Sequence, residues 1–227
     1  MSGQFTGDRK RLNHFLLSYE RGIIDACLPH VPLWMSTVHL TLMTLLWSAG
    51  IVFSGWLAAG NIHWLWLSSL CVFLQHVTDM LDGEVGRGRN EGLIKWGFYM
   101  DHFLDYVFLC SIVIGYSFLL PVSYAPLVLA ALALLGGFMV HVLLDFSITS
   151  DFKISFRRFG ASEGRYVVIA LNTAIIVFGK VFFAPLFPIL VGATLLALIA
   201  LIYNSQQLYR SIDMDFKQKA KLCDAPS

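Results

Sequence analysis

Two pairs of aspartates lie between two of the most apolar stretches of this chain. The first pair is Asp79 and Asp82, and the second is Asp101 and Asp105. Residues three or four apart share one helix face, with Cβ atoms about 5 to 6 Å apart. Because the connection between the two stretches is short, the two helices are expected to be antiparallel neighbours with opposed faces. The spacing therefore predicts that four carboxylates converge on one point.

Such a cluster needs positive charge beside it. On insertion scales each unpaired aspartate costs about 2.5 to 3.5 kcal/mol at the centre of a bilayer. Two divalent cations about 3.5 to 4 Å apart, bound by hard oxygen ligands, satisfy the charge and suit displacement at phosphorus. Arg87 is the one basic counter-charge expected there. Together with the small residues Gly83, Gly86 and Gly97 it fits phosphate, which needs a cation and close approach of the main chain.

The order of these residues resembles a known signature, that of the CDP-alcohol phosphotransferases, which are integral membrane enzymes of phospholipid synthesis. The residues that carry the resemblance are Asp79-x-x-Asp82-Gly83-x-x-Gly86-Arg87 and then Gly97-x-x-x-Asp101-x-x-x-Asp105. All spacings inside each half are those of the family. Two departures are that Gly86 stands where the family usually has Ala, and that the connection from Arg87 to Gly97 is one residue longer than usual.

The resemblance implies a reaction and a set of roles. A substituted phosphate group would pass from a CDP-linked donor, CDP-diacylglycerol or a CDP-alcohol, to an alcohol acceptor, with release of CMP. Asp79, Asp82 and Asp101 would hold two Mg2+ or Mn2+ ions with help from Asp105, which would also be the catalytic base. The nucleotide and its diphosphate would be bound by Gly83, Gly86, Arg87 and Gly97. Further expected partners are membrane lipids and a second copy of the chain, but no nucleic acid.

The composition is that of a membrane protein. Hydrophobic residues make up 57% of the 227 residues and charged residues only 14%, unlike an average soluble domain. The apolar stretches predict an all-α membrane protein with six transmembrane helices. The expected spans are about 35–59, 62–82, 94–120, 127–146 and 166–183, with a sixth that follows a turn marked by Pro185 and Pro188 and ends near Tyr203.

Segments at both ends of the chain lie outside these spans. An N-terminal amphipathic helix is expected to lie on the membrane surface within residues 1–34, ended by Pro29 and Pro32. The expected organisation is an interfacial segment at 1–34, a transmembrane catalytic domain at 35–206 and a cytoplasmic tail at 207–227.

The distribution of Lys and Arg predicts the orientation. Alternate loops collect Arg9, Lys10, Arg11 and Arg21, then Arg87, Arg89 and Lys95, then Lys153, Arg157, Arg158 and Arg165, and finally Arg210, Lys217, Lys219 and Lys221. Only Lys180 falls on the other side. By the positive-inside rule, both termini and the aspartate cluster are expected to be cytoplasmic. This requires an even number of spans.

A basic and aromatic segment from Thr149 to Glu163 precedes the fifth span. One interpretation is an interfacial segment whose long side chains reach the headgroups. The other is a site for the phosphate of a lipid or a phosphorylated substrate, with candidate residues Arg157, Arg158, Glu163 and Arg165. Near the acids, His76 and His102 are expected to form hydrogen bonds rather than to bind metal. Asp145 is expected to be a supporting or interface residue.

Two other functions are compatible with carboxylates in a membrane protein. A membrane prenyltransferase also presents aspartates to a metal-bound diphosphate, but its two motifs lie in separate halves of a longer bundle. A cation transporter would place its acids near the midplane, often within a pseudo-repeat. Here the acids cluster at one end of their spans beside glycines and an arginine, which favours phosphoryl transfer.

Overall fold

The computed structural model describes residues 17–149 and 161–223, and these residues form helices and short connections without a strand. The helices are α1 (Leu17–Cys27), α2 (Thr37–Ala58), α3 (Leu65–Gly88), α4 (Ile94–Ser117), α5 (Ala125–Thr149), α6 (Ala161–Phe178) and α7 (Lys180–Cys223). Short 3-10 turns occupy Leu28–His30, Ile62–Trp64 and Val122–Tyr124. The predicted all-α class is confirmed.

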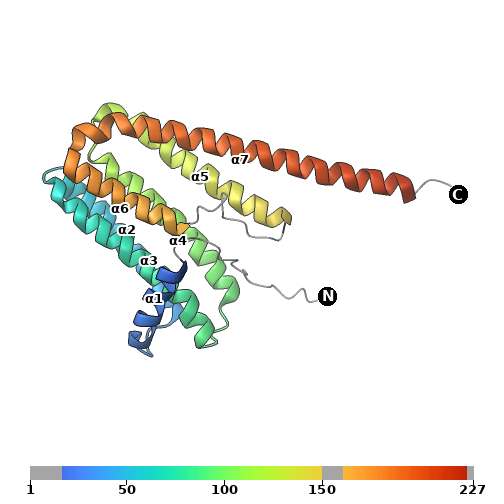
Figure 1. Cartoon of the computed structure of the whole chain (residues 1–227), viewed down its shortest axis with the longest axis horizontal. Helices are drawn as coiled ribbons and strands as arrows, with labels where there is room; N and C mark the ends of the chain where they lie inside the picture. Colours follow the sequence, from blue (N-terminus) through green and yellow to red (C-terminus); the bar gives the residue numbers. More distant parts are fainter. Residues whose placement is uncertain (1–16, 150–160, 224–227) are drawn as a thin grey trace.

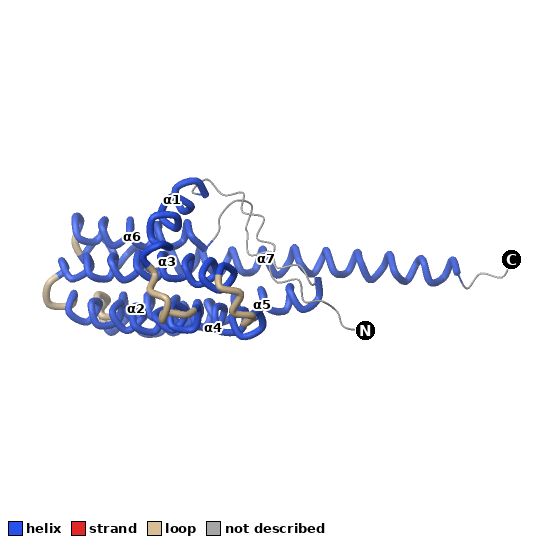
Figure 2. Tube along the Cα trace, turned by 90° about the horizontal axis from the view of Figure 1, so that it is seen from below, coloured by secondary structure: helices blue, strands red, loops and turns tan. Residues whose placement is uncertain are grey.

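Four of the described helices are long and apolar enough to cross a membrane: Thr37–Ala58, Ile94–Ser117, Val122–Ile148 and Lys180–Met214. The protein is therefore a multi-pass membrane protein. The two remaining expected spans are α3, which carries the first aspartate pair, and α6, whose apolar part is the shorter Gly164–Phe178. Both lie alongside the other helices (Figure 2). That they also cross the membrane stays a prediction.

The helix α2 organises the bundle. It is the main packing partner of both α3 and α4, while α6 packs on α3, α5 on α4, and α7 on α5 and α6. Small residues allow the close approach. A Cβ atom at Gly55 would lie 2.5 Å from the carbonyl oxygen of Gly115 in α4, and one at Gly50 would lie 2.7 Å from the Sγ of Cys71 in α3. The two acid-bearing helices are thus held in place mainly by α2 rather than by each other.

The turn between the last two helices differs from the prediction. Pro185 and Pro188 lie inside α7, so the expected turn at these residues is wrong. The chain turns instead at Gly179, whose φ of 82° is in the left-handed region and whose amide donates to the carbonyl of Ile175 at 2.8 Å. Glycine ends helices in this way without steric cost. Proline inside a membrane helix is tolerated because neighbouring structure satisfies the freed backbone groups.

The ends of the chain are more helical than expected. The helix α7 continues past residue 206 without a break to Cys223 and projects beyond the other helices (Figure 1). The helix α1 covers part of the expected surface helix and stops before Pro29, as predicted. Residues 1–16 of that segment lie outside the described residues. The boundaries at 34 and 206 and the membrane-surface role of α1 stay predictions.

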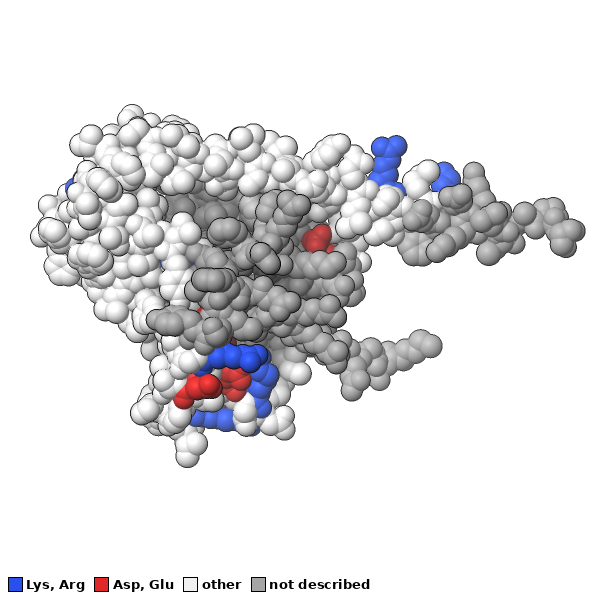
Figure 3. All heavy atoms as spheres, viewed as in Figure 1, with Lys and Arg blue, Asp and Glu red and all other residues white. Residues whose placement is uncertain are grey.

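Charge is unevenly distributed over the surface. In Figure 3, Lys, Arg, Asp and Glu gather at the end of the bundle that carries α1 and the α3–α4 connection, and Lys and Arg appear again along the far part of α7. Few charged side chains are visible among the described residues over the body of the bundle in this view. The interior is apolar, with Val72, Phe108, Ile175 and Phe183 almost completely buried. The candidate site lies between this interior and the charged end.

Candidate active site

Three aspartates from two helices come together at the charged end. Asp79 and Asp82 of α3 and Asp101 of α4 are partly buried, and one oxygen from each lies within 4.8 Å of the others. The three-residue spacing in α3 places both of its acids on one face, and that face meets Asp101. Carboxylate oxygens in this arrangement suit a hard divalent cation such as Mg2+ or Mn2+.

The fourth aspartate, Asp105, is joined to Asp79 by an arginine from α6. The Nη2 of Arg165 donates to Asp79 Oδ2 at 2.9 Å and to Asp105 Oδ1 at 3.3 Å. Arg165 is only 6% exposed, and its guanidinium carbon lies 5.8 Å from the ring centroid of Phe108. The expectation that Arg87 is the only counter-charge is therefore wrong. A distant helix supplies a buried cation that bridges the two acid-bearing helices.

Hydroxyl groups on α2 hold the first motif in place. The hydroxyl of Thr41 donates to Asp82 Oδ2 at 2.9 Å, and that of Thr37 donates to the backbone carbonyl of Asp82 at 2.6 Å. Thr44 and Ser48 continue the same buried face of α2. These residues were not predicted from the sequence. Their signal is a run of hydroxyl side chains at spacings of four, three and four in an otherwise apolar helix.

The predicted diphosphate residues lie in the same two helices as the aspartates, with Gly83, Gly86 and Arg87 in α3 and Gly97 in α4. Arg87 has a side chain that is 70% exposed and pairs with Glu84 at 2.9 Å. A Cβ at Gly83 would lie 3.3 Å from the Nη2 of Arg87, and one at Gly86 would lie 3.1 Å from the Oγ1 of Thr37. Gly97 has open space beside it, with no heavy atom within 4 Å of such a Cβ. Their roles toward a nucleotide stay predictions.

The connection between the two motifs is tied to the start of α2. Arg89 donates to the carbonyls of Val31 and Met35 at 3.1 and 2.5 Å. The carboxylate of Glu91 accepts from the amide of Thr37 at 3.1 Å, which satisfies a free amide in the first turn of α2. The connection that holds the extra residue therefore contacts both the segment before α2 and the first residue of α2.

The structure describes only some of the other residues that were singled out in the sequence. Arg157 and Arg158 lie outside the described residues. Glu163 lies in the first turn of α6, and its side chain is likewise not described. Asp145 accepts a hydrogen bond from Tyr209 of α7, which makes it an interface residue as expected. His102 contacts the carbonyl of Phe98 through Nδ1 at 2.6 Å, in keeping with its predicted hydrogen-bonding role.

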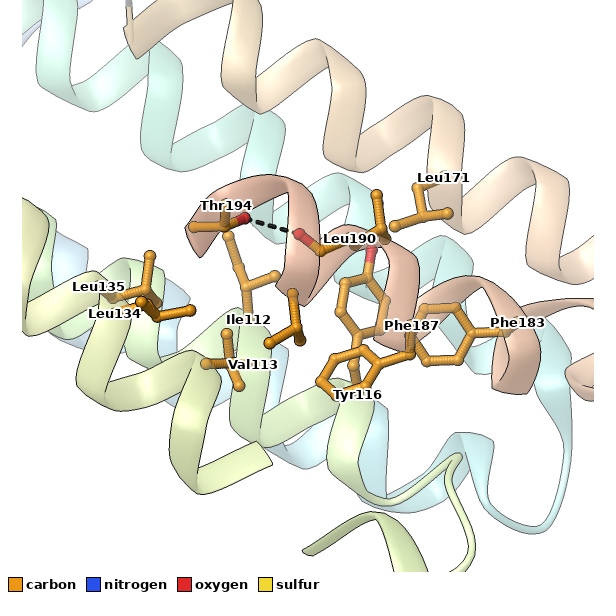
Figure 4. A pocket seen from close by; sticks show the side chains of 12 residues that line it. Ile112, Val113, Tyr116, Leu134, Leu135, Leu171, Phe183, Phe187, Leu190 and Thr194 are labelled. Carbon is orange, nitrogen blue, oxygen red and sulfur yellow. Dashed lines mark hydrogen bonds between the residues drawn. The ribbon is translucent and has the colours of Figure 1, made fainter. Parts of the chain in front are cut away.

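An apolar cavity of about 150 Å³ lies deeper in the bundle, between α4, α5, α6 and α7 (Figure 4). Tyr116, Phe183 and Phe187 form one side of it. The hydroxyl of Tyr116 donates to Asn172 Oδ1 at 2.8 Å inside the bundle. Because Tyr116 follows Asp105 by eleven residues, it lies about 16 Å further along α4. The cavity is therefore separate from the carboxylates.

Comparison with known proteins identifies the family. The family model described as CDP-alcohol phosphatidyltransferase matches residues 30–210. The chain belongs to this family. The resemblance found in the motifs is thereby confirmed, and the matched region includes the four aspartates, Arg87 and Arg165. A CDP-alcohol phosphatidyltransferase transfers substituted phosphate groups, so the protein is a transferase. No match was found among curated proteins or among solved structures.

Proposed function

We propose that this transferase moves a substituted phosphate group from a CDP-linked donor to an alcohol acceptor and releases CMP in phospholipid biosynthesis. The donor is CDP-diacylglycerol or a CDP-alcohol. The observation that carries the proposal is the convergence of Asp79, Asp82 and Asp101 within 4.8 Å, at the charged end of an apolar bundle. Carboxylates so arranged bind the divalent cations that accompany diphosphates in phosphoryl transfer.

The aspartates would act as the ligands of two Mg2+ or Mn2+ ions, with Asp105 assisting. Such ions, when bound, supply positive charge to the attacked phosphorus and to the departing CMP. Neighbouring residues form hydrogen bonds to these carboxylates. Thr41 orients the Asp82 carboxylate, and Arg165 donates hydrogen bonds to both Asp79 and Asp105. A carboxylate held by such partners keeps its orientation before a cation arrives.

Arg87 would contact the diphosphate of the donor. Its present partner, Glu84, forms an exposed ion pair within one helix turn, and such pairs contribute little to stability. Exchanging that carboxylate for a diphosphate oxygen would give a charge-assisted and bidentate contact. The absence of side chains at Gly83 and Gly97 would leave room for the nucleotide, whereas Gly86 lies against Thr37 of α2.

Asp105 is proposed as the base that takes the proton of the acceptor alcohol. It follows Asp101 by one helix turn and accepts a hydrogen bond from Arg165 at 3.3 Å. A base takes up the proton of the alcohol only as the carboxylate. It must also lie within hydrogen-bond reach of the hydroxyl, about 2.6 to 3.2 Å.

The site, both termini and the Arg157–Arg158 pair are proposed to face the cytoplasm, because Lys and Arg concentrate in the loops on that side. Arg157 and Arg158 would contact the phosphate of a lipid or phosphorylated substrate. Arg165, predicted for the same role, instead pairs with acids. The working unit is proposed to be a homodimer. Cation transport and prenyl transfer are less suited to a site that combines acids, glycines and two arginines at one end of the bundle.

Release of CMP tests the proposal. The purified full chain in lipid nanodiscs would be incubated with Mg2+ and either CDP-diacylglycerol plus small polar alcohols, or CDP-choline plus diacylglycerol. We expect CMP from one donor class, only with a matching acceptor, and none from the Asp82→Asn variant. Failure to release CMP from every donor and acceptor pair would contradict the proposed reaction.

A further inference from the structure

The buried side chain of α1 is an acid. Among residues 20–27, whose side chains are described, Glu20 is only 5% exposed, whereas Ile23 and Ile24 are half-buried and Asp25 is exposed. A helix that merely lies on a membrane would bury its isoleucines instead. A buried carboxylate is costly unless it is paired with a hydrogen-bond donor or a cation. The burial of Glu20 therefore calls for a specific role inside the bundle.

One side chain that faces Glu20 is His76 of α3, which is 1% exposed. Its Nε2 lies 3.4 Å from Glu20 Oε1, and its Nδ1 lies 3.4 Å from the Nη1 of Arg165. A guanidinium only donates hydrogen bonds, so the Nδ1 that faces it must accept. The ring proton is then assigned to Nε2, which faces the carboxylate of Glu20. The edge contact of the Tyr166 ring, with centroids 5.5 Å apart, fixes the plane of the imidazole.

Arg165 connects the Glu20–His76 pair to the aspartates of the site. One of its terminal nitrogens faces His76, and the other donates to Asp79 and Asp105. Because the guanidinium is rigid and planar, fixing Nη1 also fixes the direction of Nη2. The contacts thus run from Glu20 on α1 through His76 and Arg165 to two carboxylates of the site.

We infer that Glu20 and His76 are positioning residues that hold Arg165, and through it Asp79 and Asp105, in the arrangement that transfer requires. This inference rests on the proposed function. It makes α1 part of the active site in addition to any role at the membrane surface.

A double-mutant comparison tests the inference on the full chain. Glu20→Gln removes the charge and keeps the shape, and Asp25→Asn makes the same change on an exposed position of α1. We expect Glu20→Gln to lower kcat/KM and Mn2+ affinity about 10-fold, as loss of a partner that orients a metal ligand does. Asp25→Asn is expected to change neither quantity.

The background variant Arg165→Lys decides whether Glu20 acts through Arg165. In that background Glu20→Gln is expected to have no further effect on either quantity, because the residue through which it acts is already altered. Additive losses, tighter Mn2+ binding or an equal loss in Asp25→Asn would overturn the inference. If the wild-type chain transfers nothing, the proposed function fails, while the Mn2+ titrations still decide the role of Glu20.

A second pair of variants covers the case in which Glu20→Gln does not fold. His76→Asn keeps an acceptor near the position of Nδ1, whereas His76→Gln places its amide near Nε2. Thermal unfolding of the metal-free protein selects folded variants for comparison. We expect His76→Asn to keep more Mn2+ affinity and more transfer than His76→Gln. The reverse order would show that the contact with Arg165 has no positioning role.

Discussion

The hydroxyl of Thr41 donates a hydrogen bond of 2.9 Å to Oδ2 of Asp82. The two residues lie in different helices, so this bond links the central helix α2 to the first acidic motif on α3. Thr37 adds a second link through the backbone carbonyl of Asp82. One of the two carboxylate oxygens of Asp82 thereby already accepts a hydrogen bond from a neutral donor. The packing of α2 therefore sets the orientation of the Asp82 carboxylate.

The first prediction concerns metal dependence. We expect EDTA to abolish CMP release and added Mg2+ or Mn2+ to restore it, because three carboxylates that converge within 4.8 Å carry more negative charge than the single guanidinium of Arg165 balances. Activity would be measured in nanodiscs after dialysis against chelator. Turnover that persists at full rate in chelator would contradict the metal-dependent mechanism.

The second prediction separates ligand from structural roles. Asp82→Asn and Asp101→Asn are each expected to leave the protein folded but inactive. In the metal-free protein, removing one of several like charges should keep or raise the unfolding temperature. Thermal unfolding in detergent measures this, with Asp213→Asn on exposed α7 as the matched control. A large drop in unfolding temperature for the two site variants would indicate that these acids serve packing.

The third prediction concerns Gly86, which stands where the family usually has Ala. An alanine at 86 would place its Cβ 3.1 Å from the Oγ1 of Thr37, the hydroxyl that holds Asp82. Gly88 lies in the same helix with no heavy atom within 4 Å of an added Cβ. We therefore expect Gly88→Ala to raise the free energy of unfolding by up to about 1 kcal/mol, and Gly86→Ala to give no such gain and to reduce transfer.

Combining Gly86→Ala with Thr37→Ala tests the cause. Removing the hydroxyl relieves the close contact, so the alanine at 86 should then add helix stability as the one at 88 does. Unfolding in detergent gives the free energies, and CMP release gives the activities. Equal stability gains for Gly86→Ala and Gly88→Ala in the wild-type background would show that Thr37 moves aside without cost.

Spacing within a helix was enough to predict part of the site. The separation of Asp79 from Asp82 fixes a shared face, and a short connection brings Asp101 back to the same end. The connection to Arg165 could not be predicted in this way. It lies in α6, and only the packing of α6 on α3 brings it to Asp79. Its position near the start of the fifth expected span suggested a residue that binds substrate phosphate.

The end of α1 agrees with the prediction, because α1 ends at Cys27, two residues before Pro29. Gly179 was overlooked because two prolines follow it closely, and proline is the stronger signal for the end of a helix in a soluble protein. In this bundle the prolines lie within α7 and the glycine turns the chain.

The fourth prediction concerns the segment before α6. Replacing Arg157 and Arg158 by Ala is expected to raise the KM for the lipid or phosphorylated substrate more than it lowers kcat, since paired guanidinium groups suit phosphate binding. Replacing the exposed Arg210 of α7 by Ala provides a control of like charge. An unchanged KM would leave the arginine pair as a signal for orientation in the membrane only.

The last prediction separates general base from metal ligand. Asp105 accepts from Arg165 at 3.3 Å, and it is not among the three aspartates whose oxygens lie within 4.8 Å of one another. We therefore expect Asp105→Asn to keep most of the metal-dependent affinity for CDP. Transfer should fall by a factor on the order of 10² to 10⁴, the usual contribution of a positioned base.

Calorimetric titration of CDP in the presence of Mg2+ measures the affinity of this variant, and CMP release measures its transfer. Asp101→Asn is the matched comparison, because it lies one turn away on the same helix and within the group of three. That variant should lose CDP affinity together with transfer. If Asp105→Asn behaves in the same way, Asp105 is primarily a ligand. The proton of the acceptor must then pass to another group, or to solvent once coordination to a cation has lowered the pKa of the alcohol.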